Sequence, residues 1–248
     1  MLYCSSIREN LFSSEKADHI IKVFMDQYKS DQNPNIISLR QFAGEKYANN
    51  QIHDAAEFIT SFCDHEILIK NAVQHEIITV LRCLECNYTS TTISTNCVVH
   101  LALPKMLTKK SFEFQDIIKH NFAGWKNLKD SCPNCDNSNT MKKIDMTASE
   151  QILIAKLHLF DHDSSGTTTK VENFYIKAMP TTKIQMGDYC YELKAAIFHH
   201  GKSIADGHYT SMVRGKGTTW VSVDDLQVEK QAWPRNAKNA YIFVFEKC

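Results

Sequence analysis

Two cysteine pairs constrain the fold of this chain more than any other feature of its sequence. Cys83 and Cys86 form the first pair, Cys132 and Cys135 form the second, and two residues separate the cysteines within each pair. This gap lets both thiolates of a pair face one ion, and four thiolates make the closed tetrahedral site that is typical of structural zinc. The stretch between the pairs is longer than in a compact zinc ribbon. We therefore expect a structural zinc site on an insertion carried between other elements.

Free thiols in a reducing compartment and a redox Cys-x-x-Cys motif are the alternatives for these four residues. The strand-like runs beside the pairs favour zinc, because a knuckle follows the order strand, cysteine pair, strand. The other cysteines lie in apolar or terminal settings, which indicate packing residues for most of them: Cys4, Cys63, Cys97, Cys190 and Cys248.

Composition limits the classes of function. The 248 residues are 43% hydrophobic and 23% charged, as in a globular protein, and 28 basic residues balance 28 acidic ones. No global field therefore favours nucleic acid or an anionic membrane. No apolar run approaches the roughly 20 residues that span a bilayer, and the first residues are not a secretion signal. These features indicate an intracellular protein without a membrane partner.

Helical periodicity appears in two early stretches. Residues 1–30 carry apolar residues at helical spacing, with Ser13 or Ser14 as the expected N-cap. In the second stretch, residues 54–63, Asp54 is placed to cap the helix, and Glu57 follows at the capping-box position.

The rest of the chain is predicted to be mostly β-structure, interrupted by a helix over residues 114–122 and a loop over residues 161–169. Strand-like runs cover residues 76–82, 97–104, 151–160, 189–199, 209–213 and 241–245.

A histidine and a carboxylate near the C-terminus are the candidate catalytic pair. His208 precedes one β-prone run, Asp224 ends another, and residues 214–217 form a turn rich in glycine and basic residues. Two antiparallel strands joined by this turn make His208 and Asp224 candidates for a hydrogen bond. Such a carboxylate orients an imidazole that activates a nucleophile. The alternative is a half-buried histidine near a surface turn.

In combination, these features resemble the ubiquitin-specific protease (USP) family of cysteine deubiquitinases, and the resemblance covers nearly the whole chain. The paired cysteines fall where the family carries its zinc-binding fingers. The similar segments are 53–58, 152–160, 191–201, 207–211, 220–225 and 239–246.

The resemblance implies an α+β, papain-like USP fold with a helical thumb, zinc-bearing β fingers and a β-sheet palm. It implies one catalytic domain over residues 1–248. Within it, residues 1–70 form a partial thumb, residues 75–145 include the fingers, and residues 146–248 form the palm with the His/Asp box.

The same resemblance assigns site residues. His208 becomes the general base and Asp224 the residue that orients it, in a reaction where a thiolate attacks the carbonyl of ubiquitin's C-terminal glycine. Asp54, Glu57, Gly207 and Tyr209 become contacts to the ubiquitin tail. For Asp54 and Glu57, helix capping and tail contact both remain open.

One departure from the family is as informative as the matches. The family's nucleophilic cysteine lies in an Asn- and aromatic-containing box, and no such box occurs in this sequence. Residues 2–6 resemble the end of the helix that follows the box, so we expect the chain to begin just after the nucleophile, with an incomplete thumb. Cys4 lacks those companions and is not expected to react. The oxyanion-hole side chain would also be missing.

Three hypotheses follow. The chain is a deubiquitinase domain that hydrolyses (iso)peptide bonds and whose native sequence begins upstream, or it is a catalytically dead ubiquitin-binding or scaffold protein. The third, a zinc-ribbon protein that binds nucleic acid, conflicts with the balanced charge and with the absence of a basic cluster near the cysteine pairs. The resemblance implies ubiquitin or a ubiquitinated protein as partner, a β-propeller activator, and a location in the cytoplasm, the nucleus or both.

Overall fold

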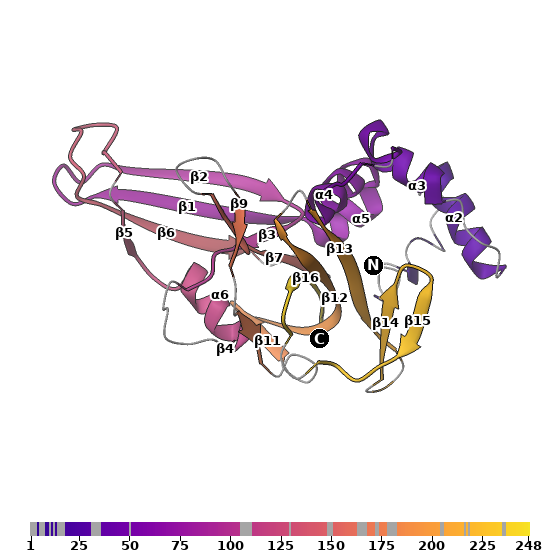
Figure 1. Cartoon of the computed structure of the whole chain (residues 1–248). Coiled ribbons are helices and arrows are strands. Elements are labelled where there is room, and N and C mark those ends of the chain that lie inside the picture. Colours follow the sequence, from indigo (N-terminus) through magenta and orange to yellow (C-terminus); the bar gives the residue numbers. More distant parts are fainter. Residues whose placement is uncertain are drawn as a thin grey trace.

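Figure 1 shows a helical layer, a long narrow sheet that projects from the body, and a broad curved sheet below the helices. The structure is a computed structural model. It describes residues 4, 8–9, 11, 13, 18–30, 36–49, 51–104, 111–128, 130–147, 151–162, 168–171, 174–177, 183–203, 206–215, 217, 219–234 and 237–248. This arrangement is the papain-like α+β architecture expected from the sequence.

The helical layer contains α2 (His19–Lys29), α3 (Ile36–Ala43), the 3-10 helix η1 (Glu45–Tyr47), α4 (Ala55–His65) and α5 (Ile67–Val73). The predicted N-cap at Ser13 or Ser14 is wrong for α2, which begins after Asp18; its carboxylate accepts a hydrogen bond from the Ile20 N–H at 2.8 Å. Ser13 lies in helical backbone and donates to the Glu9 carbonyl at 2.8 Å, as serines inside helices do. Ser14 lies outside the described residues.

The finger sheet is the projecting element, with the strand order β2-β1-β6-β5. Its strands are β1 (His75–Cys83), β2 (Thr89–Asn96), β5 (Lys126–Leu128) and β6 (Thr140–Thr147). All its pairings are antiparallel. The sequence indicated only a polar stretch over the start of β2, because this strand is exposed along most of its length and has no apolar face to reveal it.

The palm sheet has the order β15-β14-β13-β12-β16-β7-β3, and β11 pairs with β12. Its strands are β3 (Val99–Leu101), β7 (Ile152–Leu157), β11 (Lys183–Met186), β12 (Tyr189–Ser203), β13 (Asp206–Arg214), β14 (Trp220–Asp224), β15 (Gln227–Lys230) and β16 (Ala240–Lys247). The runs predicted at 76–82, 151–160, 189–199, 209–213 and 241–245 are therefore confirmed as strand regions.

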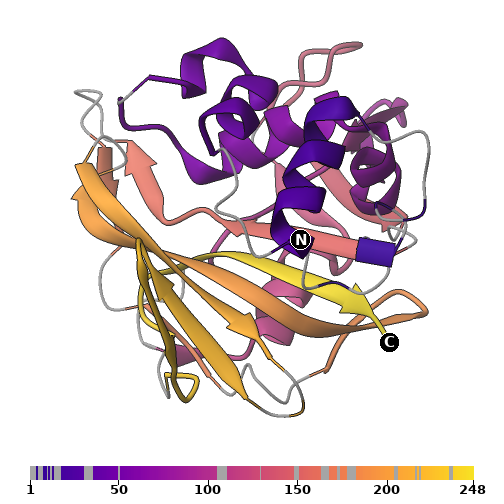
Figure 2. The ribbon, with the colours of Figure 1, turned by 90° about the vertical axis from the view of Figure 1, so that its right-hand side faces the viewer.

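Both faces of the palm sheet are covered near its middle. The helical layer lies on one side and α6 (Phe114–Phe122) on the other (Figure 2). The Phe114 ring contacts the Phe243 ring at 4.9 Å between centroids. Because β7 lies between these layers, residues 152–155 are completely buried and read as one continuous apolar run.

Two short strand pairs complete the fold. β4 (Ser111–Phe112) pairs with β10 (Tyr175–Ile176), and β8 (Phe160–His162) pairs with β9 (Thr168–Lys170). The loop predicted over residues 161–169 is therefore wrong at its ends, where β8 and β9 form; residues 163–167 lie outside the described residues. Among the helices that the structure describes, none combines the length and apolarity needed to cross a membrane.

Candidate functional site

The hairpin formed by β13 and β14 brings His208 and Asp224 together. Ser211 lies opposite Val223 in this pairing, so Asp224 ends β14 beside the first residues of β13. His208 Nε2 and Asp224 Oδ1 are 2.5 Å apart. The hydrogen bond predicted from the sequence is present, although 16 positions separate the two residues.

This contact sets the chemistry of the imidazole. The hydrogen bond with Asp224 is the main cause that raises the pKa of His208 above its usual value, and the charges of Asp224 and Asp225 add to it. With Nε2–H donating to the carboxylate, Nδ1 is the basic nitrogen. No described residue forms a hydrogen bond with Nδ1, and the His208 side chain is 45% exposed. The imidazole can therefore take a proton from a group that approaches Nδ1.

Gly207 positions the backbone directly before His208. Its φ is +152°, and a Cβ at this position would lie 2.6 Å from His199 Nε2 and 2.6 Å from the His200 carbonyl oxygen. The buried His199 ring also packs against the Tyr209 ring at 5.0 Å between centroids. Glycine is thus required here because the chain crosses a buried ring in close contact.

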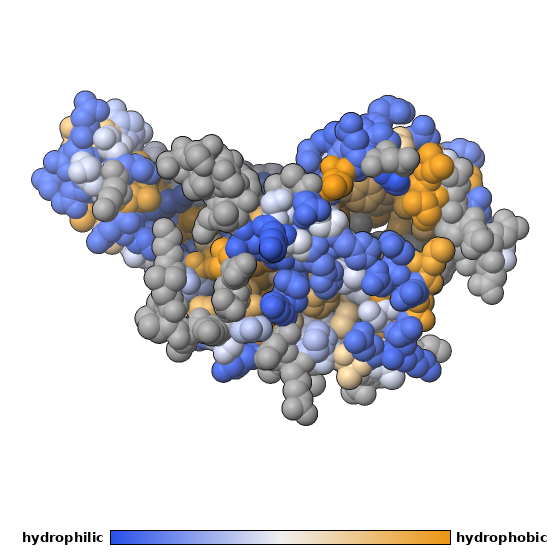
Figure 3. Space-filling view, in the orientation of Figure 1, coloured by the Kyte–Doolittle hydropathy of each residue, from blue (hydrophilic) through white to orange (hydrophobic). Residues whose placement is uncertain are grey.

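A cleft of about 540 Å³ between the helical layer and the palm sheet lies next to this pair. Figure 3 shows hydrophobic surface on both sides of the opening between these two parts. The cleft is lined from the helical side by Arg40, Tyr47, Gln51, His53, Ala55 and Phe58, and from the palm by Ile197, Tyr209, Thr210, Ser211, Val223 and Asp225. Most of the lining residues lie in the family-like segments 53–58, 191–201, 207–211 and 220–225, but the sequence alone does not show that these segments meet in one cleft.

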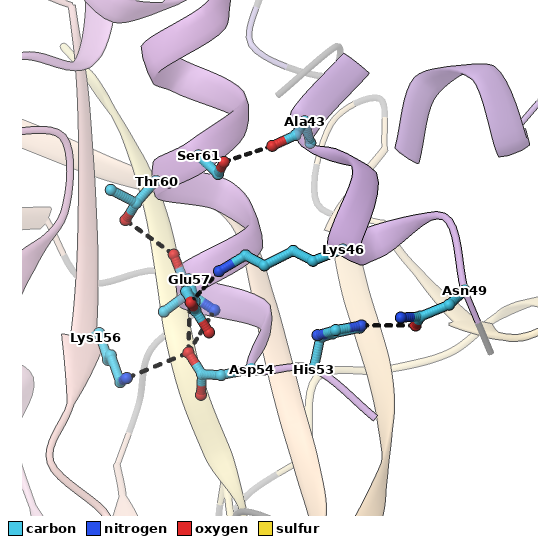
Figure 4. A network of polar contacts seen from close by, with 10 residues as sticks. Ala43, Lys46, Asn49, His53, Asp54, Glu57, Thr60, Ser61 and Lys156 are labelled. Atoms are coloured by element: carbon cyan, nitrogen blue, oxygen red, sulfur yellow. Dashed lines mark hydrogen bonds and ion pairs between the residues drawn. The ribbon is translucent and has the colours of Figure 1, made fainter. Parts of the chain in front are cut away.

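Asp54 joins the helical layer to the palm sheet (Figure 4). Its Oδ1 caps α4 by accepting from the Ala56 and Glu57 N–H groups at 3.0 and 2.9 Å, and the Lys156 ammonium lies 3.3 Å from the same oxygen. The Tyr241 hydroxyl donates to Oδ2 at 2.5 Å. Burial raises the pKa of Asp54, but the Tyr241 hydroxyl, the Lys156 charge and the backbone donor outweigh it and hold the pKa below its usual value.

Glu57 differs from Asp54 in its surroundings. Its side chain is 56% exposed and pairs with Lys46, instead of reaching back to the Asp54 N–H as a complete capping box requires. The capping prediction is therefore confirmed for Asp54 alone. Glu57 presents its carboxylate at the surface beside the start of α4.

None of the nine cysteines lies beside His208. Cys4 is 1% exposed, and burial raises the pKa of its thiol to about 11. The charge of Lys194 acts on the Cys4 thiol. Lys194 lies on β12, roughly 20 Å along the strand from His200, the residue opposite His208 in the strand pairing. The others are engaged elsewhere: Cys63 with Cys97, Cys190 with Cys248, and the remaining four with one another.

The two Cys-x-x-Cys pairs form matching turns at the tip of the finger sheet. The Cys83 N–H donates to the Tyr88 carbonyl at 2.9 Å, and the Cys132 N–H donates to the Asn137 carbonyl at 2.8 Å. Each turn closes with a residue of positive φ directly after its second cysteine, Asn87 in one and Asp136 in the other. Asparagine and aspartate tolerate this conformation better than most residues.

The four thiols can hold one metal ion, because all their Sγ atoms lie within 4.8 Å of one another. The Cys83–Cys135 and Cys86–Cys132 sulfur pairs are each 3.7 Å apart. A tetrahedral ion with Zn–S bonds of about 2.3 Å would place its ligands roughly 3.8 Å apart. The spacing therefore fits a zinc-sized tetrahedral centre.

The sequence analysis missed the residues that hold Asp54 and His199 in place. Lys156 and Tyr241 hold Asp54, and Lys170 donates to the His199 carbonyl and, at 3.1 Å, to Asn239. One signal was available for Lys156, which is the only charged residue in an apolar strand and so demands a buried partner. No comparable pattern marks Tyr241.

Comparison with known proteins gives a consistent family. The family model described as ubiquitin carboxyl-terminal hydrolase matches residues 4–245. Ubiquitin carboxyl-terminal hydrolase 20 of Arabidopsis thaliana is 25% identical over 206 residues, which are 73% of this chain and 28% of the relative. Ubiquitin carboxyl-terminal hydrolase 44 of Danio rerio is 24% identical over 213 residues, 71% of this chain and 30% of the relative. The chain thus spans less than a third of these relatives' length.

Solved structures share the fold. The SAGA Ubp8/Sgf11/Sus1/Sgf73 DUB module bound to ubiquitin aldehyde matches with a TM-score of 0.77 and 16% identity, covering 100% of this chain and 65% of that chain. The SAGA module bound to monoubiquitin also gives 0.77, at 17% identity and with the same coverage.

Proposed function

This chain belongs to the ubiquitin carboxyl-terminal hydrolase family, and we propose that it forms the ubiquitin-binding and acid–base part of a cysteine-type deubiquitinase domain. The reaction would be hydrolysis of the (iso)peptide bond at the C-terminal glycine of ubiquitin. The observation that carries the proposal is the His208–Asp224 pair, whose neighbours Tyr209, Val223 and Asp225 line the cleft between helices and palm.

His208 suits both proton transfers of thiol catalysis. Nδ1 would accept the thiol proton when the thiolate attacks the glycine carbonyl, and Asp224 would stabilise the resulting imidazolium. The imidazolium would then protonate the departing lysine amine, and after this step the neutral imidazole would activate water to clear the thioester. The raised pKa of His208 favours the imidazolium that the first step creates.

We propose that the 248 residues alone do not turn over substrate, because none of their thiols can reach Nδ1. A thiol and an oxyanion donor from another segment would complete the site. The second candidate function is a catalytically inactive ubiquitin-binding or scaffold protein, and the same lack of a thiol beside His208 favours it.

The ubiquitin tail would occupy the cleft between the helical layer and the palm. Tyr209 lines this cleft, Gly207 lets the backbone beside His208 pass close to the His199 ring, and the exposed Glu57 can exchange Lys46 for a group of the tail. The Asp54 carboxylate is occupied by α4, Lys156 and Tyr241, so it would act on the tail by fixing the position of α4.

We further propose zinc as the ion of the four-cysteine cluster, held by Cys83, Cys86, Cys132 and Cys135 in a structural role, since four protein ligands leave no position for water. An intracellular location, in the cytoplasm or nucleus, agrees with a thiolate site that needs reducing conditions. Neither of the two SAGA module structures compared above names a β-propeller partner, and such a partner is not part of the proposal.

Two measurements test the function. Calorimetric titration should detect binding of ubiquitin to the chain, and Tyr209→Ala should weaken it, whereas Tyr189→Ala, an exposed tyrosine at the start of β12 that does not line the cleft, serves as the matched surface control. Ubiquitin with an electrophilic C-terminus should not label the 248-residue chain. A covalent adduct on Cys4, or no ubiquitin binding at all, would overturn the proposal.

The coding sequence upstream of Met1 separates the two candidates. An in-frame segment with an Asn- and Cys-containing box supports the enzyme, and the longer chain should then react with the electrophilic probe. Replacing His208 with alanine in that longer chain should abolish turnover while leaving ubiquitin binding in place. If no such segment exists, the scaffold function is the better account.

A further inference from the structure

Cys190 and Cys248 form a cysteine pair outside the metal cluster, at the end of the palm sheet remote from His208. Cys190 is the second residue of β12, and Cys248 directly follows β16. Their Sγ atoms are 2.9 Å apart, and the Cys248 N–H donates to the Cys190 carbonyl at 2.9 Å. Tyr191 lies opposite Lys247 in the strand pairing, so the two cysteines are the next opposed residues.

The backbone at this position can accept a disulfide. Opposed residues of a hydrogen-bonded antiparallel pair have Cα atoms about 5.5 Å apart. Disulfides span Cα separations of roughly 4.4–6.8 Å and need about 2.05 Å between sulfurs. Closing the gap from 2.9 Å therefore takes a shift of less than about 1 Å, which a small side-chain rotation provides.

Accessibility sets this pair apart from the other cysteines outside the metal cluster. Cys4, Cys63 and Cys97 are 1%, 0% and 5% exposed, so a dissolved oxidant does not reach them in the folded protein. Cys190 is half-buried and Cys248 is exposed. Burial and the hydrogen bond with Cys190 raise the pKa of the Cys248 thiol, so oxidation should accelerate as the pH rises and thiolate forms.

We propose that Cys190 and Cys248 are a reversible oxidation site. Their two thiols form an intramolecular disulfide when a peroxide or glutathione disulfide oxidises them. With hydrogen peroxide, one thiolate attacks the peroxide oxygen and becomes a sulfenic acid, releasing water after proton uptake. The second thiol then attacks this sulfur, the S–S bond forms and a second water leaves. Two thiols lose two electrons and two protons, and one peroxide becomes two waters.

With glutathione disulfide the same product forms by exchange. One thiolate displaces a glutathione thiolate to give a mixed disulfide, and the second displaces the other glutathione. Two molecules of reduced glutathione are released, so electrons and protons again balance.

The disulfide would close a segment of 58 positions that contains most of the palm sheet. Such a closure restricts the unfolded chain, and the oxidised protein should unfold roughly 5–10 °C higher than the reduced one. Residue 190 lies roughly 33 Å along β12 from His200, so the crosslink should leave the pKa of His208 unchanged. The inference is therefore independent of the proposed function.

The test uses the full chain with its metal cluster loaded, equilibrated in glutathione buffers of increasing oxidised fraction. Alkylation followed by peptide mass mapping should show one new link, between the peptides containing residues 190 and 248, with loss of two hydrogens. The melting temperature should rise together with this link, and dithiothreitol should reverse both. Cys190→Ser and Cys248→Ser should each abolish link and shift, whereas the control Cys63→Ser should retain both.

Several outcomes would overturn the inference. These are continued alkylation of both thiols in oxidising buffer, a stable glutathione adduct that does not resolve, a disulfide between two copies of the chain, or a link at Cys63 and Cys97. A melting shift that persists in Cys190→Ser would also contradict it, because the stabilisation would then have another origin.

Discussion

Tyr241 donates a 2.5 Å hydrogen bond to Asp54 across 187 positions of sequence, and this bond ties the last palm strand to the start of α4. Tyr241→Phe should lower the free energy of unfolding by about 1–3 kcal/mol, because the carboxylate loses a partner but keeps its other three. Urea denaturation measures this change. No effect on stability would mean that the contact does not hold the two layers together.

Replacing Asp54 with alanine should cost more, roughly 3–5 kcal/mol, because it removes the N-cap and leaves the Lys156 charge partly buried and unpaired. Glu57→Ala is the matched control on the same helix turn. Its exposed carboxylate should change the free energy of unfolding by less than about 1 kcal/mol. Equal losses in the two variants would contradict the role assigned to Asp54.

The lowered pKa of Asp54 also predicts how the free energy of unfolding depends on pH. Its pKa is lower in the folded protein than in the unfolded chain, so its contribution is fully present above the unfolded pKa of about 3.9 and is lost as the pH falls through the folded value. The wild-type free energy of unfolding should therefore fall more steeply below about pH 4 than that of Asp54→Asn. Parallel curves from pH 6 to pH 2 would exclude this linkage.

The contribution of His208 to stability depends on pH in the opposite direction. Because its pKa is raised in the folded protein, the pair with Asp224 contributes stability below the unfolded histidine pKa of about 6.5 and loses it as the pH rises through the folded value. An NMR titration of the ring protons should place His208 above that reference. Asp224→Asn should lower the pKa of His208, whereas Ser222→Ala, on the same strand, should leave it unchanged. A wild-type value at or below the reference would rule out the pairing in solution.

The sequence predicted those features that leave a local pattern or a family motif. β7, β12 and β16 are apolar or alternating runs, and the knuckle cysteines have a fixed spacing. These elements and their positions could therefore be predicted from the sequence. β2 was only partly predictable from the sequence, because its residues face solvent along most of its length and leave no apolar pattern. The contacts of Asp54 with Lys156 and Tyr241 depend on strand order in the finished sheet, which no window of sequence contains. Ser13 failed as a cap because Asp18, a residue of equal capping strength, stands where the helix starts.

Gly207 provides a further test of the backbone beside His208. In Gly207→Ala, the new Cβ would lie 2.6 Å from both His199 Nε2 and the His200 carbonyl oxygen, at a φ of +152° that L-residues rarely adopt. The variant should lose about 1–3 kcal/mol of folding free energy, and the NMR signal and pKa of His208 should change as the chain moves away from the His199 ring.

Gly187→Ala is the control, because its φ is also positive, at +56°, but nothing lies within 4 Å of its Cβ. It should lose only about 1–2 kcal/mol from the conformation itself and leave His208 untouched. Equal effects on the His208 signal in both variants would show that φ alone, and not the His199 ring, requires glycine at position 207.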